Sequence, residues 1–146
     1  MRMNVLTAVA LASAVSLASP GAQAQTVEGA HAFLAEATTR GSTRVSWFPV
    51  EDQPGTVVTR WTGSGCRSEV TLASGVTVPI DWSTVSKVDT LDYGKALAIS
   101  SARFPVYASG VNRFWAVMES PETVTRAMKA ADFLRTACDT LAKTGF

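Results

Sequence analysis

Few residues in this chain could be catalytic or bind a metal, and the cysteines among them are expected to form a structural disulfide. Cys66 and Cys138 are the only cysteines. No Cys-x-x-Cys pair suggests redox catalysis, and two cysteines with one histidine are too few for a typical zinc site. We therefore expect Cys66 and Cys138 to form a disulfide, which would stabilise the fold by about 4 kcal/mol in the chain-entropy model. Two free thiols, or one nucleophilic thiol, are the alternatives.

His31 is the only histidine, and it falls among small apolar residues of a predicted helix. A general base needs a nucleophile and an orienting acid nearby, and no motif in the sequence supplies them. We expect His31 at the helix surface or partly buried, without a catalytic role. The acidic residues do not follow a calcium-loop pattern. No catalytic residue, metal site or cofactor is predicted.

Aromatic and basic side chains are the remaining candidates for ligand contact. The four tryptophans fall in or beside predicted strands, where they either fill the core or line a ligand cleft. Core packing is favoured for the group, but Trp82 lies near a predicted strand end and is kept as a ligand-contact candidate. Four arginines fall on predicted strands, where they either gather into one basic face that captures an anion or belong to solvated strand faces: Arg60, Arg67, Arg103 and Arg113. Arg60 and Arg113 are kept as ligand-contact candidates.

Two helices and a set of strands must position these residues. Apolar residues at helical spacing predict a helix over 26–40. Ser120 as N-cap and Pro121 as first residue predict a second helix, whose apolar stripe includes Cys138. Phe133 falls on its polar face, where it either packs against the first helix, the favoured reading, or is exposed to a partner. About seven strands are expected, from the candidates 43–47, 56–62, 66–72, 76–78, 85–91, 95–100, 103–107 and 112–119.

The first 24 residues have the pattern of an export signal. Arg2 supplies the positive start, residues 5–17 are uncharged and largely apolar, and Ala22-Gln23-Ala24 suits signal peptidase. The apolar run is shorter than the roughly 20 residues that span a bilayer. We expect cleavage after Ala24, which leaves one domain over 25–146. Export to an oxidising compartment also favours the disulfide over free thiols.

Cleavage would leave the mature chain electrically neutral. The precursor has 13 basic and 12 acidic residues, and Arg2 is the only charged residue of the predicted signal. A neutral domain with interspersed charges has no electrostatic footprint for nucleic acid or anionic lipid. We predict a soluble protein, periplasmic or secreted, that does not bind nucleic acid and does not insert into a membrane after signal cleavage.

The second half of the chain resembles a pleckstrin-homology-like (PH-like) domain. The resemblance covers about 81–141 and follows the run 80–88, then 96–99, Phe104 and the helix from Pro121. It implies an α+β fold in which a C-terminal amphipathic helix packs on a strongly bent antiparallel sheet, or partial barrel, of about seven strands. The N-terminal helix and the cysteine pair depart from that plan, and the basic loop of phosphoinositide-binding members is not evident.

Three functions are compatible with this sequence. The favoured one is a small exported binding or adaptor protein that recognises another envelope or secreted protein through a sheet edge or an exposed aromatic patch. The second is an inhibitor or protective factor for a secreted enzyme, which would use a loop at 51–55 or 109–112. The third and least favoured is an enzyme that uses carboxylate, arginine or tyrosine chemistry.

Overall fold

The computed structural model describes residues 26–40, 43–47, 56–91, 94–101, 103–104 and 113–144. The predicted signal 1–24 lies outside the described residues. The elements are α1 (Val27–Thr39), β1 (Arg44–Trp47), β2 (Thr56–Ser64), β3 (Arg67–Leu72), β4 (Thr77–Asp81), the 3₁₀ turn η2 (Trp82–Thr84), β5 (Val85–Leu91), β6 (Ala96–Ser101), β7 (Arg113–Val117) and α2 (Pro121–Thr144).

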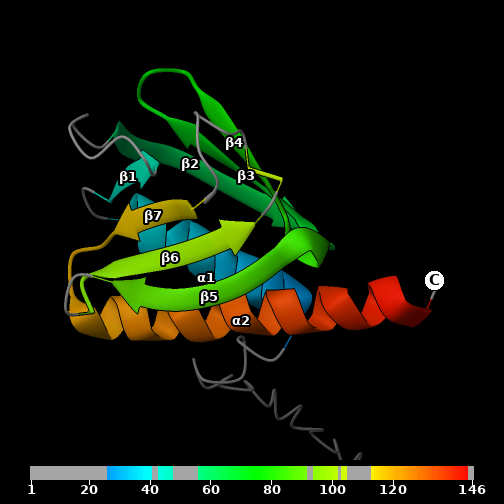
Figure 1. Cartoon of the computed structure of the whole chain (residues 1–146). Helices are drawn as coiled ribbons and strands as arrows, with labels where there is room; N and C mark the ends of the chain where they lie inside the picture. Colours follow the sequence, from blue (N-terminus) through cyan, green and yellow to red (C-terminus); the bar gives the residue numbers. More distant parts are fainter. Residues whose placement is uncertain are drawn as a thin grey trace, which may run out of the picture.

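The described strands form one antiparallel sheet in the order β4-β3-β2-β1-β7-β6-β5. The sheet is bent, so that the β2–β4 half is inclined to the β5–β7 half (Figure 1). Its two edge strands, β4 and β5, are consecutive in the chain and are joined by η2. The edges therefore approach each other at one corner without closing a barrel, as the predicted fold class requires.

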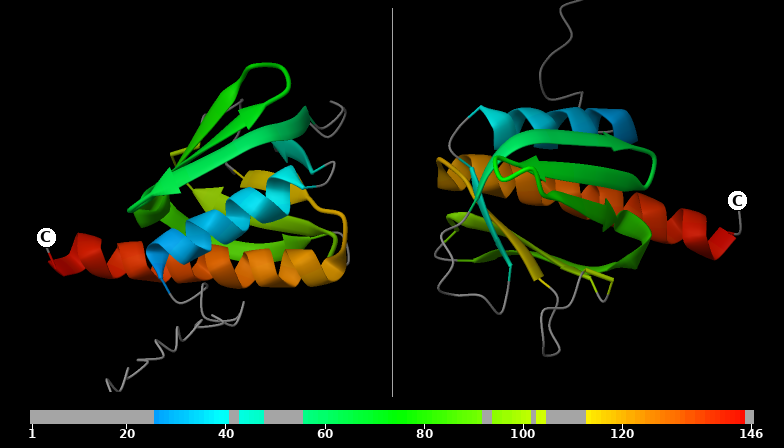
Figure 2. Two further views of the ribbon diagram at one scale, coloured as in Figure 1. Left: turned by 180° about the vertical axis from the view of Figure 1, so that it is seen from behind. Right: turned by 90° about the horizontal axis from the view of Figure 1, so that it is seen from above.

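Both helices pack on the inner side of the bent sheet. α1 lies mainly against β2 and α2, while α2 lies against α1, β5, η2 and β6; Figure 2 shows the two helices side by side. Ser120 Oγ accepts a hydrogen bond from Thr123 N at 3.2 Å and so caps α2 as predicted. None of the helices in the described part of the chain is long and apolar enough to span a membrane.

The core is built by alternation along the strands and by one stripe on each helix. On β7, Phe114 and Ala116 point inward and are fully buried. The Phe114 ring meets Trp61 edge-on, with 6.1 Å between ring centroids. The buried stripe of α2 consists of Val124, Ala127, Ala130, Ala131, Leu134 and Cys138. This stripe confirms the helical periodicity seen in the sequence.

One expected strand is wrong where it can be checked. Arg103 and Phe104, the start of the candidate at 103–107, form a turn after β6. The amides of both residues donate to Ser101, at its hydroxyl and its carbonyl respectively. The turn directs the Phe104 ring into the core, where it is 3% exposed and contacts Phe114. A buried aromatic residue therefore looked like part of a strand in the sequence.

The predicted disulfide between Cys66 and Cys138 is present. Their Cα atoms are 5.6 Å apart, and the residues are separated by 72 positions in the sequence. Cys138 lies on the buried stripe of α2, and Cys66 lies in the turn between β2 and β3. The bond therefore ties the final helix to the β2–β3 hairpin.

Candidate functional site

Trp82 is part of the core and offers no surface to a ligand. Its side chain is fully buried, and its indole Nε1 donates to Ser68 Oγ at 2.9 Å. The Asp81 side chain caps η2 by accepting from Ser83 N, and this turn carries the Trp82 ring inward. The strand end was identified correctly in the sequence, but the ring points away from solvent. Trp82 therefore drops out as a ligand-contact residue.

His31 is buried, which corrects the expectation of a surface or partly buried histidine. Its Nε2 lies 2.9 Å from the carbonyl oxygen of Gly65, to which only an N–H can donate. In the neutral ring Nδ1 is then an acceptor, and it receives the hydroxyl of Ser68 at 3.1 Å. Ser68 in turn accepts from Trp82, so every polar atom of this chain of contacts is satisfied. In the sequence, the position of His31 three residues before Leu34 was the feature that indicated its burial, because residues at this spacing share one face of a helix.

The contact between Ser68 and His31 has the spacing of a nucleophile and its base, but it is placed for packing. Ser68 is 1% exposed and His31 is 3% exposed, so no substrate can approach either group. A backbone carbonyl, not a carboxylate, accepts from His31 Nε2, and Ser68 faces Nδ1, the nitrogen that a Ser-His-Asp triad gives to its carboxylate. A Cβ atom at Gly63 would overlap the His31 ring, so the β2 backbone lies directly against it. The arrangement joins α1 to the hairpin.

Phe133 is half-buried and packs against the core. It lies two turns after Arg126 on the same face of α2, and the Arg126 guanidinium lies 4.7 Å from the centroid of the Phe33 ring on α1. This face of α2 therefore looks toward α1. The packing alternative for Phe133 agrees with this position better than exposure to a partner.

Arg60 and Arg113 do not meet. Arg60 is exposed on β2 opposite Thr71 of β3, whereas Arg113 is half-exposed on β7 opposite Ser100 of β6. The two strands belong to different halves of the bent sheet and are separated by β1. A single basic face that contains both residues is therefore not formed, because the bend separates strands that the sequence could not place.

Neither edge of the sheet is open to full pairing with an added strand. The Leu72 amide donates to the Val76 carbonyl at 2.9 Å, so these residues form a hydrogen-bonded pair of the β3–β4 ladder. Hydrogen-bonded and non-hydrogen-bonded pairs alternate along an antiparallel ladder. The pair of Glu69 with Pro79 is therefore non-bonded, which turns Pro79 to the free edge of β4. Proline has no N–H to offer there.

The opposite edge, β5, is occupied in another way. The Thr90 amide donates to the carboxylate of Asp89 at 2.8 Å, so this donor is not available to an added strand. Asp89 also forms an ion pair with Lys87 at 2.6 Å. The Lys87 hydrogen bond, followed by the Thr90 amide, lowers the pKa of Asp89 below its usual value of 3.8. Sheet-edge recognition, one of the two modes expected, is thus disfavoured at both edges.

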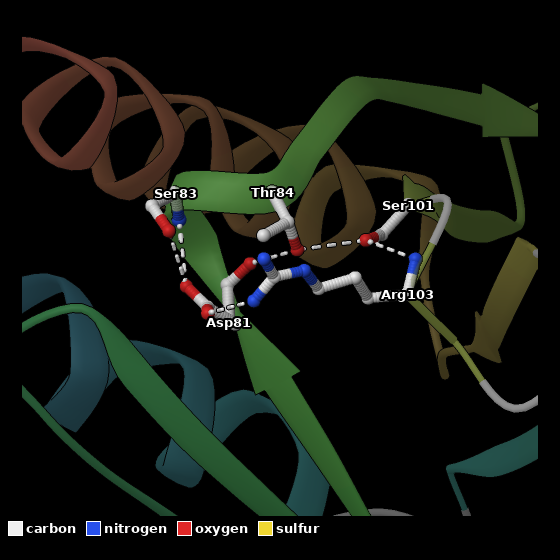
Figure 3. Close-up of polar contacts among 5 residues, drawn as sticks. All are labelled: Asp81, Ser83, Thr84, Ser101 and Arg103. Atoms are coloured by element: carbon white, nitrogen blue, oxygen red, sulfur yellow. Dashed lines mark hydrogen bonds and ion pairs between the residues drawn. The ribbon is translucent and has the colours of Figure 1, made fainter. Parts of the chain in front are cut away.

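The corner where the edges approach carries a group of polar contacts (Figure 3). Asp81 accepts from the amide and the hydroxyl of Ser83, and Thr84 Oγ1 lies 2.9 Å from Ser101 Oγ. Arg103 reaches back to Asp81, with 3.7 Å between nitrogen and oxygen, from an exposed position. These contacts join η2 to the end of β6. These polar groups bond to one another and stabilise the corner.

The outward side of β1, β7, β6 and β5 is a candidate surface for recognition, and mainly its margins are exposed, because Ala96 and Ala98 in its middle are 2% and 1% exposed. We call it the outer face; its described members are Arg44, Lys87, Asp89, Leu91, Ala96, Ala98, Ser100, Arg113, Trp115 and Val117, and it continues to Val57 of β2. In Figure 1, β5, β6 and β7 lie in front of α1. The outer face is therefore the side of the sheet opposite the packed helices.

Strand register orders the outer face into three rows. The first row is polar and cationic: Lys87, Ser100 and Arg113 are cross-strand neighbours, and Arg113 Nε donates to Ser100 Oγ at 3.3 Å. The second row is Asp89, Ala98 and Trp115. The third row is largely apolar, with Leu91, Ala96, Val117, Arg44 and Val57 in register, and Val117 is 40% exposed. Cationic side chains therefore lie in both the first and the third row, and most of the apolar side chains lie in the third.

The described residues offer less support for a metal site or an inhibitor loop. No group of three or more His, Cys, Asp or Glu side chains gathers there as a metal site would require. The loops at 51–55 and 109–112, on which the inhibitor hypothesis depends, lie outside the described residues. The outer face is consequently the best-defined candidate for a binding site.

Comparison with known proteins supports the fold. No protein-family model and no curated protein sequence matches this chain. Among solved structures, the PH domain from TgAPH is similar, with a TM-score of 0.56 and 11% identity over 81% of this chain and 95% of that one. The PH domain from PfAPH also has a TM-score of 0.56, with 10% identity over 78% and 92% of the two chains. The architecture is therefore PH-like, as the sequence predicted.

Proposed function

We propose that this chain is an exported, disulfide-stabilised binding protein of the cell envelope that holds another envelope or secreted protein on its outer face. The single observation that carries this proposal is the outer face itself. It is the side of the sheet away from the helices, and its exposed members combine cationic Arg44 and Lys87 with apolar Val57 and Val117, whereas Ala96 and Ala98 are buried. Such a combination suits a protein surface better than a uniform charge would.

Three further observations support the proposal. The disulfide between Cys66 and Cys138 fits an oxidising compartment and agrees with an export signal at 1–24. The PH-like architecture is one that other proteins use for binding, although fold alone does not determine function. The Ser68–His31 contact is buried beyond the reach of substrate, which disfavours the enzyme alternative for this pair.

The proposal is tested by photocrosslinking in cells that export the protein. A photoreactive amino acid at Val117, which is 40% exposed on the outer face, is expected to give a crosslinked product of defined mass. Val76, 51% exposed in the turn between β3 and β4, is the matched control and should give none. Equal products from both positions, or a product from Val76 alone, would contradict an outer-face partner.

A further inference from the structure

The two cysteines of the disulfide differ in their access to solvent. Cys138 is 0% exposed on the apolar stripe of α2, whereas Cys66 is only half-buried. Gly65 and Cys66 form the two-residue turn of the β2–β3 hairpin, which Ser64 and Arg67 close as register partners. Gly65 is exposed, and a Cβ atom there would meet no described atom within 4 Å. The disulfide is therefore open to approach from the hairpin turn and not from α2.

The hairpin turn is held in place by contacts other than the disulfide. The carbonyl oxygen of Gly65 accepts from His31 Nε2 at 2.9 Å, and the carbonyl oxygen of Cys66 accepts from the Trp82 amide at 2.9 Å. These bonds attach the turn to α1 and η2 without involving either sulfur atom. When the disulfide is broken, they keep Cys66 close to Cys138, and such proximity favours closure of the bond.

We propose that Cys66 is the site at which this disulfide exchanges with other thiols and disulfides, and that Cys138 is the resolving cysteine. In reduction, the thiolate of an external thiol attacks Cys66 Sγ. The sulfur–sulfur bond breaks, and its electron pair leaves with Cys138 as a thiolate that takes up a proton. Cys66 is then joined to the external thiol in a mixed disulfide. A second external thiolate attacks the external sulfur of that mixed disulfide, which releases Cys66 and leaves an external disulfide.

Oxidation follows the same route in reverse. The Cys66 thiolate attacks an external disulfide and displaces one of its sulfurs as a thiolate. The Cys138 thiolate then attacks Cys66 Sγ, displaces the second external sulfur and forms the native bond. Two electrons thus pass from the cysteine pair to the external disulfide. That disulfide belongs either to a small thiol such as glutathione or to a protein with a Cys-x-x-Cys site, and the step at Cys66 is the same.

The test is treatment of the oxidised mature protein with reduced glutathione, followed by an early quench with iodoacetamide and peptide mapping by mass spectrometry. In chains that carry one glutathione, we expect it on Cys66 and the alkyl group on Cys138. The preference should be about tenfold or more, because exchange requires an accessible sulfur. The same reaction in urea is the matched control, in which unfolding exposes both sulfur atoms and the preference should disappear.

The resolving role of Cys138 is tested in the same samples. When excess glutathione is removed before the quench, the native disulfide should re-form with release of glutathione, because Cys138 displaces it from Cys66. Reduced thioredoxin with its second Cys-x-x-Cys cysteine replaced by serine is the protein probe. A trapped complex through Cys66 supports exchange with proteins, whereas glutathione on Cys66 without such a complex supports exchange with small thiols.

Several outcomes would overturn this inference. They are glutathione on Cys138, an equal distribution over both cysteines in native buffer, a preference for Cys66 that persists in urea, or a mixed disulfide that does not resolve. Mixed disulfides that form in urea but not in native buffer would show that the fold shields both sulfur atoms. Because the test uses neither the outer face nor a partner bound there, its failure leaves the crosslinking result from Val117 unaffected, and the reverse also holds.

Discussion

At the scale of single residues, the structure gives the one histidine a packing role with a complete set of hydrogen bonds. His31 bonds to Gly65 and Ser68, and Ser68 bonds to Trp82; the two bonds of Ser68 are buried, and the bond to Gly65 is partly buried. A buried polar chain of this kind is stable only when every member has its partner. The backbone of Gly63 is close enough to the imidazole that a methyl group there would displace the ring. His31 and Gly63 are thus parts of one fitted contact.

Gly63→Ala is expected to lower the free energy of unfolding by about 1–3 kcal/mol, because the added methyl overpacks the site and misaligns the His31 bonds. In a His31→Ala background the methyl has room, so the cost of Gly63→Ala should fall. The double-mutant cycle, measured by urea denaturation of the oxidised protein, should therefore give a coupling of about 1 kcal/mol or more. Additive costs would show that the two residues do not interact.

Asp89 is the residue whose ionisation the fold changes most clearly. Its carboxylate accepts from Lys87 and from the Thr90 amide, and both bonds favour the charged form. The pKa in the folded state is therefore lower than in the unfolded state. The resulting stability is present above pH about 4 and is lost as the pH falls through the folded-state value.

Lys87→Gln should raise the pKa of Asp89 toward 3.8, because the Lys87 hydrogen bond is the main cause of its lowering. The pKa is followed by an NMR titration of the Asp89 side chain between about pH 2 and 6. Lys95→Gln removes an exposed lysine from the turn between β5 and β6 and serves as the control. An unchanged pKa in the Lys87 variant would assign the shift to the Thr90 amide instead.

At the scale of elements, the β2–β3 hairpin is the part of the fold on which most connections converge. Cys66 ties it to α2, Gly65 and Ser68 bind it to α1 through His31, and Ser68 also receives Trp82 of η2. One covalent bond and one hydrogen-bonded chain therefore hold four elements together. Except for Val57 of β2, the outer face lies on the other half of the sheet, so this support is largely separate from the proposed binding surface.

Loss of the disulfide should lower the free energy of unfolding by about 4 kcal/mol, since the bond closes a loop of 72 positions in the unfolded chain. Urea denaturation of the wild type with and without reductant measures this difference without leaving a cavity. A Cys66→Ala, Cys138→Val variant should resemble the reduced wild type. A change below about 1 kcal/mol would show that packing alone holds α2 in place.

The edges of the sheet make a separate prediction about association. Pro79→Thr restores an N–H donor at the free edge of β4, and an open edge strand is a template for pairing with a second chain. We expect concentration-dependent self-association by analytical ultracentrifugation, while Val76→Thr in the adjoining turn should leave the protein unchanged. A monodisperse Pro79→Thr variant would show that proline is not what protects this edge.

At the scale of the whole molecule, the proposed export would explain together the disulfide, a neutral mature chain and an envelope or secreted partner. Cleavage after Ala24 should place Gln25 at the N-terminus of the mature protein. Intact-mass measurement of protein recovered from the envelope or medium tests this, and alkylation without reductant should add nothing to the cysteines. Protein that keeps the leader, or takes up two alkyl groups, would contradict export to an oxidising compartment.

The sequence alone was enough to predict features that repeat locally or depend on residue type. The two helices, most strands, the α2 cap at Ser120 and the buried position of Cys138 follow from periodicity and capping, which act over a few neighbouring residues. The pairing of Cys66 with Cys138 followed because only two cysteines are present. The PH-like architecture followed from the order of these elements.

Only the tertiary structure decided which side of an element faces solvent and which distant residues meet. His31 is buried because Gly63 and Ser68, more than 30 residues away in the sequence, pack against its ring. Trp82 is buried because the 3₁₀ turn η2 directs its ring inward. Arg60 and Arg113 are separate because the sheet bends between them. Strand order and register, which no local pattern encodes, put Lys87 of β5 and Ser100 of β6 beside Arg113 of β7.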